Sequence, residues 1–392
     1  MTTPAPVPPE MRAMPTSVGG GGEGVVNAEL LSAPFPYFGG KSRVASEIWQ
    51  RLGDVDSYVE PFCGSLAVLL ARPHKPQTTE TVNDVDRFLA NFWRAVKHAP
   101  AEVAEWADWP VNEVDLEARH YWLVTKGRDR LADFMGDPEG YDAKVAGWWV
   151  WGACAWIGSG WCSGEGPWRW DGEAWINRRK LPHLGGDRGI NRQLPRLSGD
   201  QGINRQLPHL GEGRGNGILD WFATLSARLR TVRVACGDWS RVCGDGITTG
   251  IGTCGVLLDP PYSAPDRAKV YSNDCFEVAH KARAWAIERG SNPKMRIAFC
   301  GYDGEFADPW PDGWTEYAWK AKGGYGNRDN ADGENVNAKR ERIWFSPHCE
   351  DNRQVDIFAR YLPHGQEPEP GETVSELRGH HGHYSRLAVR QA

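Results

Sequence analysis

The amino-acid sequence predicts an α/β fold with a mainly parallel sheet. Strand-like and helix-like segments alternate from Pro34 onward, as in chains whose helices connect parallel strands. The alternation stops over residues 99–217 and then resumes, which indicates that an insertion divides one α/β domain. The apolar run at 256–258 ends abruptly on an acid and two prolines, as expected where a buried strand reaches the edge of a sheet.

Apolar spacing and polar turns predict the elements in order. Before the insertion we expect a helix at 42–52, a strand at 57–62, a helix opening at 67–72, a strand at 80–86 and a helix at 88–96. After it we expect a helix at 218–230, strands at 231–239 and 255–262, a helix at 278–290, and strands at 295–303 and 339–347. The domain plan is a disordered Pro/Gly-rich tail at 1–32, the α/β domain at 33–98 and 218–360, an inserted domain at 99–217, and a solvated tail at 361–392.

The insertion has an unusual composition. It holds eleven of the twenty tryptophans, and those of residues 147–162 are expected to form a compact helical core; stacking on bases is the alternative. Three copies of a repeat follow at 181–193, 194–206 and 207–217. Their Pro and Gly content excludes a continuous helix, so an extended loop is expected.

Charge and cysteine content narrow the function classes. The formal net charge of −6 excludes a surface coated in positive charge, so contact with nucleic acid requires a local basic patch. Residues 169–217 supply one, with nine Lys or Arg against five Asp or Glu. Nine cysteines without zinc-type spacing predict reduced thiols in a cytosol and no metal site. Neither a signal peptide nor a membrane-spanning run is expected.

The stretch GVLLDPPY at 255–262 carries the chemistry. Asp259 follows a predicted buried strand, and Pro260 and Pro261 fix the backbone so that its carbonyls are rigid acceptors. A carboxylate, a fixed carbonyl and the ring of Tyr262 suit a planar molecule that bears an NH2 group. The alternative is a strand end with a simple Pro-Pro turn.

Four further motifs support a nucleotide-like cofactor. Gly39 and Gly40 precede Lys41 in PFPYFGGKSRV but lack the spacing of a phosphate loop, and YVEPFCGSLAV is a strand, Gly turn and helix. Asp84, at the end of the next strand, is placed to bond ribose hydroxyls or to cap a helix. In CGDW, Asp238 and Trp239 are placed to hold an adenine ring, although core packing of the tryptophan is an equal alternative.

In this order the motifs resemble the Dam-type, D12 class DNA adenine-N6 methyltransferases, over residues 34–98 and 218–350. The family's W-x-G-G-K appears with Tyr37 in place of Trp, and its E-P-F-x-G-x-G appears at 60–66 with Leu66 in place of the last Gly. The resemblance implies a Rossmann-like methyltransferase sheet flanked by helices, with the Trp-rich insertion as the recognition domain. It also implies S-adenosyl-L-methionine as methyl donor and an adenine flipped out of double-stranded DNA.

The implied site follows residue by residue. The catalytic group comprises Asp259, Pro260, Pro261 and Tyr262, and the cofactor is expected to contact Tyr37, Gly39, Gly40, Lys41, Phe62, Gly64, Asp84, Asp238, Trp239 and Asp259. Candidate DNA contacts are Arg178, Arg179, Lys180, Asn191, Arg192, Asn204 and Arg205, since Arg, Asn and Gln read base edges.

Three alternatives to this activity stay open: cytosine-N4 methylation, methylation of RNA, and an inactive DNA-binding protein. We expect a cytoplasmic monomer in a bacterial or phage-infected cell, with a restriction endonuclease as a conceivable counterpart.

Overall fold

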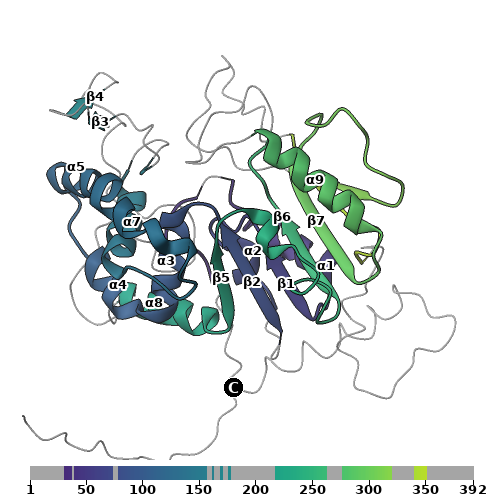
Figure 1. The fold of residues 1–392 in the computed structure, drawn as a ribbon, viewed down its shortest axis with the longest axis horizontal. Coiled ribbons are helices and arrows are strands. Elements are labelled where there is room, and N and C mark those ends of the chain that lie inside the picture. The colour runs from purple at the N-terminus through teal and green to yellow at the C-terminus, as the bar shows by residue number, and fades with distance from the viewer. Residues whose placement is uncertain are drawn as a thin grey trace, which may run out of the picture.

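Seven strands form one mixed sheet in the order β5-β2-β1-β6-β7-β9-β8 (Figure 1). The computed structural model describes residues 31–37, 39–73, 78–156, 161–162, 168–170, 175–177, 217–262, 276–319 and 340–350 of the chain. Five neighbouring strands are parallel, whereas β9 runs antiparallel to β7 and to β8. The strands of this sheet are β1 (Ser57–Glu60), β2 (Thr79–Asp84), β5 (Val232–Cys236), β6 (Cys254–Leu258), β7 (Met295–Tyr302), β8 (Thr315–Ala318) and β9 (Glu341–Phe345).

The predicted α/β fold with a mainly parallel sheet is confirmed. All six predicted strands form, and each ends one to four residues earlier than expected. Strand β8 was not predicted. A separate hairpin, β3 (Trp168–Trp170) with β4 (Trp175–Asn177), lies in the insertion.

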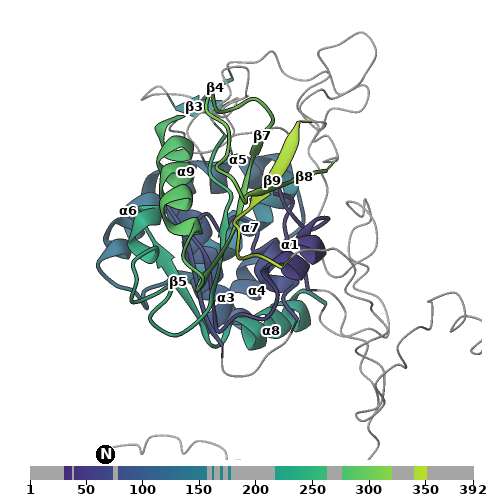
Figure 2. The same ribbon diagram turned by 90° about the vertical axis from the view of Figure 1, so that its right-hand side faces the viewer.

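The helices cover both faces of the sheet. Alternate strand residues enter two hydrophobic clusters, with Tyr58 and Leu257 in one and Val59 and Val256 in the other. Seen from the β8 edge, α9 lies on one side of the sheet and α1 on the other (Figure 2). The helices are α1 (Ala45–Leu52), α2 (Ala67–Leu70), α3 (Arg87–His98), α4 (Pro100–Ala107), α5 (Glu113–Trp122), α6 (Arg128–Arg130), α7 (Ala143–Ala155), α8 (Gly217–Leu229) and α9 (Phe276–Gly290).

The Trp-rich helices share the core of the α/β domain. Helices α4 and α7 pack on α3 and α8 beyond the β5 edge of the sheet (Figure 1). The ring of Trp149 in α7 lies 5.1 Å from that of Phe35 and 5.7 Å from that of Phe92 in α3. No break in the core therefore marks the predicted boundary at residue 98, and a separate inserted domain stays a prediction.

Candidate active site

The site is built where the strand order reverses. The chain runs from β1 outward to β2 and β5, and later from β6 outward to β7, so β1 and β6 are neighbours at the switch point. These two strands are parallel, with Val59 opposite Val256, so their carboxyl ends meet at one edge. Ligands of open α/β sheets bind at such a switch point. The loop after β1 and the Asp259–Tyr262 corner after β6 therefore lie side by side, as the sequence predicts.

Asp259 lies at the centre of a hydrogen-bonded network. Its Oδ2 is 2.8 Å from Lys41 Nζ, which also donates to the Gly39 carbonyl at 2.8 Å. The Tyr262 hydroxyl lies 3.2 Å from Asp259 Oδ1 and 2.8 Å from Glu341 Oε2. Lys41 is buried, whereas 21% of the Asp259 side chain is exposed. The network thus holds a partly open carboxylate in place from two sides.

Tyr262 is more enclosed than its predicted stacking role suggests. It is only 8% exposed, its ring packs edge-on against Tyr302 at 4.5 Å, and Lys41 Nζ lies 5.4 Å from the ring centroid. Pro260 is buried and Pro261 is half-buried. Stacking of a base on this ring requires the surrounding groups to move apart.

Burial and neighbouring charges perturb the protonation of this site. Burial disfavours the Lys41 ammonium, but the charges of Asp259 and Glu341 outweigh it and raise the pKa of Lys41 well above its ordinary value. Burial also raises the pKa of Glu341, although the charge of Lys41 opposes the shift. At the end of β1, burial raises the pKa of Glu60 to about 8, despite a hydrogen bond from the Tyr58 hydroxyl. Such shifts are typical of functional sites.

Asp84 is not the cap of the next helix but joins the loops that follow β1 and β2. Asp86 caps α3, because its carboxylate accepts from Phe88 N at 2.9 Å and from Leu89 N at 3.4 Å. The Asp84 carboxylate instead accepts from Gly64 N at 3.1 Å and from Asp86 N at 2.9 Å, between the loops that follow β1 and β2. This resolves the two alternatives for Asp84 in favour of the loop position.

The loop after β1 depends on glycine at position 64. Gly64 has φ +44°, and a Cβ there would come within 2.6 Å of Tyr37 Cε1. Tyr37 therefore lies directly against the loop, and Gly39 and Gly40 lie exposed beside it. Tyr37, Lys41, Gly64 and Asp84 are brought together as predicted, but nothing bound in the structure identifies what they hold.

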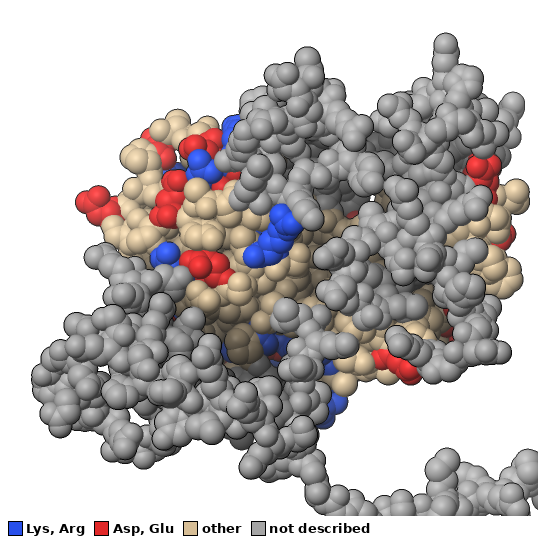
Figure 3. Space-filling view, turned by 180° about the vertical axis from the view of Figure 1, so that it is seen from behind, with Lys and Arg blue, Asp and Glu red and all other residues tan. Residues whose placement is uncertain are grey.

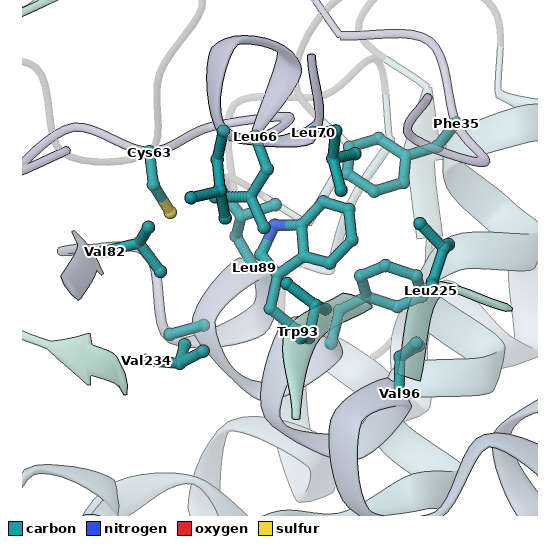
Figure 4. Packing of buried hydrophobic residues seen from close by; sticks show 14 of the residues in the cluster. Phe35, Cys63, Leu66, Leu70, Val82, Leu89, Trp93, Val96, Leu225 and Val234 are labelled. Atoms are coloured by element: carbon teal, nitrogen blue, oxygen red, sulfur yellow. The ribbon is translucent and has the colours of Figure 1, made fainter. Parts of the chain in front are cut away.

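Leu66 adopts the left-handed backbone conformation favoured by glycine, the residue that the family motif has at this position. Its φ is +55° and ψ +23°, and it lies immediately before α2. The side chain is fully buried among Leu70, Cys63 and Trp93 (Figure 4). Burial of a large apolar side chain offsets a backbone strain of about 1–2 kcal/mol, so the loop turns here without glycine.

The CGDW residues divide into one exposed and one buried group. Asp238 is exposed and its carboxylate accepts from Ser240 N at 3.0 Å. Trp239 is 9% exposed and stacks on Phe62 at 5.9 Å, with Trp285 packed edge-on at 6.2 Å. Trp239 is thus packed in the core, which is one of the two alternatives for this residue, whereas Asp238 is accessible to solvent.

Sequence reasoning missed two buried residues at this edge. Glu341 starts β9, and because β9 is antiparallel its first residue lies beside the last residue of β7, Tyr302. Asn83 Nδ2 donates to the carbonyls of Pro61 and Gly237, both at 3.0 Å, and so ties the loop after β1 to the loop after β5. Asn83 directly precedes Asp84, a predicted site residue, so the sequence held a signal for it. The sequence held no such signal for Glu341.

The predicted DNA contacts at 178–180, 191–192 and 204–205 lie outside the described residues, as do most of the predicted tails. On the face seen in Figure 3, both basic and acidic side chains are in view among the described residues. Among the described ranges, no cluster of three or more His, Cys, Asp or Glu is arranged to hold a metal ion. The helices in those ranges include none with the length and apolar character that crossing a membrane requires.

A comparison with known protein families found one match, which covers part of this site. Residues 37–119 match the family model described as D12 class N6 adenine-specific DNA methyltransferase. The match includes Tyr37, Lys41, Gly64 and Asp84, and it extends beyond residue 98 into the predicted insertion, through α4 and most of α5. A comparison with curated proteins gave no match. Over residues 37–119 the chain is therefore similar to the D12 class N6 adenine-specific DNA methyltransferases.

Proposed function

We propose that this chain transfers a methyl group from S-adenosyl-L-methionine to N6 of an adenine flipped out of double-stranded DNA. The family match supports methylation of DNA adenine. The observation that carries the proposal is the Asp259–Tyr262 corner at the switch point of the sheet, with Asp259 bonded to buried Lys41.

The corner suits the chemistry of an aromatic amine. The N6 lone pair of adenine is delocalised into the ring, so the amine needs positioning more than a strong base. Asp259 Oδ1 and the Pro260 carbonyl accept its two N–H groups and leave the lone pair directed at the methyl carbon. As the N–C bond forms, the bond between the methyl group and sulfur would break to leave a neutral thioether, and the Asp259 carboxylate stabilises the positive charge that develops on N6. The N6 proton is then lost to solvent.

The residues on the β2 side fit the cofactor. When bound, S-adenosyl-L-methionine supplies an electrophilic methyl group on a sulfonium sulfur. The half-buried Asp84 carboxylate is an acceptor for ribose hydroxyls, and Asp238 is an accessible acceptor for an adenine amine. Tyr37 packs against Gly64 in the loop after β1, and Phe62 of the same loop stacks on Trp239.

The test is methyl transfer to plasmid DNA that lacks adenine methylation, with the labelled nucleosides identified after digestion. N6-methyladenine in DNA is expected. N4-methylcytosine as the product, or label in RNA alone, would replace the proposal with one of the other substrates.

Asp259→Asn tests the catalytic role. The amide keeps the size of the side chain but removes the charge that stabilises N6, so kcat is expected to fall about 100-fold or more while DNA affinity is kept. Asp303→Asn is the matched control, because Asp303 follows β7 at the same edge but pairs with Arg342 at 2.9 Å. Full turnover by Asp259→Asn would remove this assignment.

A further inference from the structure

Glu341 lies at the edge of the sheet that carries Asp259 because its strand, β9, runs antiparallel to β7. It is 6% exposed and comes from β9, whose antiparallel direction places its first residue at the edge where β6 and β7 end. Its Oε2 lies 2.8 Å from the Tyr262 hydroxyl. A buried carboxylate from a distant part of the chain is thus linked to Asp259 through one phenol oxygen.

The Tyr262 hydroxyl has a single proton and two carboxylates within reach. The distance to Glu341 Oε2 is 2.8 Å, ordinary for O–H···O, whereas the distance to Asp259 Oδ1 is 3.2 Å, longer than such bonds usually are. The proton therefore belongs to the bond with Glu341. A neutral group in place of Glu341 would leave the Asp259 carboxylate as the stronger acceptor, since hydrogen bonds to charged groups are the stronger ones.

The consequence for Asp259 concerns its free lone pairs. Its Oδ2 already accepts from Lys41 Nζ at 2.8 Å. If the Tyr262 proton turned to Oδ1, both oxygens would be engaged and an incoming amine would compete with an internal donor. A carboxylate at Glu341 prevents this by holding the phenol proton on its own side.

We infer that Glu341 is a positioning residue for methyl transfer, which keeps the Tyr262 hydroxyl proton away from Asp259 Oδ1 so that this oxygen accepts the target amine. This inference rests on the proposed function. It adds a second carboxyl side chain, from strand β9, to the Asp259–Tyr262 corner.

Glu341→Gln and its combination with Tyr262→Phe provide the test. The amide is similar in size to the carboxyl but lacks its charge, so the phenol proton turns to Asp259 and kcat falls about 10- to 100-fold. The KM for DNA and the Kd for S-adenosyl-L-methionine are expected to stay within about threefold, because the proposed role of Glu341 is exerted through Tyr262 and Asp259. Assays at pH 8 favour the ionised carboxylate. Glu316→Gln is the matched control: Glu316 lies on neighbouring β8 and pairs with Arg342 at 2.9 Å.

The double variant separates positioning from mere structural support. Tyr262→Phe removes the competing proton, so adding it to Glu341→Gln is expected to raise kcat back to that of Tyr262→Phe alone. A double variant slower than Tyr262→Phe alone would overturn the inference, and so would loss of cofactor binding in Glu341→Gln. Absence of methyl transfer by the unaltered chain would overturn the proposed function as well.

Discussion

The backbone at Leu66 gives an unusual order of substitution effects. Glycine normally destabilises a protein more than alanine does, but at φ +55° it relieves the strain that any Cβ creates. Leu66→Ala keeps the strain and loses a fully buried side chain, at a cost of about 2–5 kcal/mol. Leu66→Gly is expected to be more stable than Leu66→Ala by about 1 kcal/mol.

Chemical denaturation of both variants measures this difference. Leu69 is the matched control, because it is also fully buried but lies within α2. At Leu69 the order reverses, with Gly worse than Ala. The same order at both positions would mean that the left-handed turn is not kept in solution.

If Asp84 binds the cofactor as proposed, cofactor binding is expected to depend on pH near neutrality. Burial, followed by the charge of Asp86, raises the pKa of Asp84 to about 7 despite two backbone hydrogen bonds. Only the carboxylate accepts from both ribose hydroxyls, so affinity for S-adenosyl-L-methionine is expected to rise about tenfold from pH 6 to pH 8. Calorimetry across this range measures the effect, and Asp84→Asn should abolish the slope.

The same shift has the opposite sign for folding. A carboxyl whose pKa is raised on folding keeps its proton where the unfolded chain has lost it. Asp84 therefore lowers the free energy of unfolding as pH rises from about 4 to about 7. Asp84→Asn should remove this contribution from a pH series of unfolding measurements. If Asp84→Asn left the pH profiles of both binding and stability unchanged, the raised pKa would belong to a group other than Asp84.

At the scale of elements, the Asn83 side chain adds to the backbone hydrogen bonds that hold the loops after β1 and β5 to the end of β2. Its side chain bonds carbonyls in the loops after β1 and β5, while its own strand lies between them. Asn83→Ala frees both carbonyls, so the loops that carry Phe62, Gly64 and Asp238 lose their common support. A loss of about 1–3 kcal/mol in stability and a weaker affinity for the cofactor are expected.

Asn91 provides the comparison for Asn83. It is fully buried in α3 and exchanges hydrogen bonds with the backbone of Asp142, at 2.9 and 2.7 Å, away from the loops. Asn91→Ala is expected to cost similar stability but to leave cofactor affinity unchanged. Equal losses of affinity in the two variants, measured by calorimetry, would show that the effect of Asn83 is general destabilisation.

The elements also show why the sequence predicts one side of the site better than the other. Ligands of parallel sheets bind at the carboxyl ends of the strands, so Asp84 and Asp259 stand out in the sequence as acids at predicted strand ends. Glu341 begins a strand instead, and only the antiparallel direction of β9 brings it to the same edge. Strand β8 was missed because Glu316 and Tyr317 show no apolar alternation, and its residues are mostly exposed.

At the scale of the whole molecule, the sequence does not predict what the Trp-rich helices α4 and α7 pack against. The composition of the Trp-rich segment predicts a compact helical unit, but whether α7 packs on itself or on α3 depends on long-range contacts that periodicity does not encode. Trp149 illustrates this, since its ring lies 5.7 Å from that of Phe92 in α3. The catalytic edge and the Trp-rich helices are thus parts of one packed structure.

Sequence preference is expected to reside in the repeats, outside the described residues. Deletion of 181–216 ends just before α8, so the site at the switch point stays intact and S-adenosyl-L-methionine binding should be unchanged. The preference for neighbouring bases should be lost, because Asn and Arg side chains that read base edges are removed. Sequencing with modified-base detection, on DNA from cells that express each variant, measures the preference.

A full-length variant separates recognition from spacing. Replacing Asn191, Arg192, Asn204 and Arg205 by Ala keeps the length of the loop and removes only the candidate contacts. Each lost bidentate base contact costs about 1–3 kcal/mol of discrimination, so this variant should methylate a broader set of sites, as the deletion does. If it retains the original preference while the deletion loses it, the repeats act as a spacer and another segment reads the DNA. If both variants retain it, recognition lies with the described helices or with residues 263–275 or 320–339.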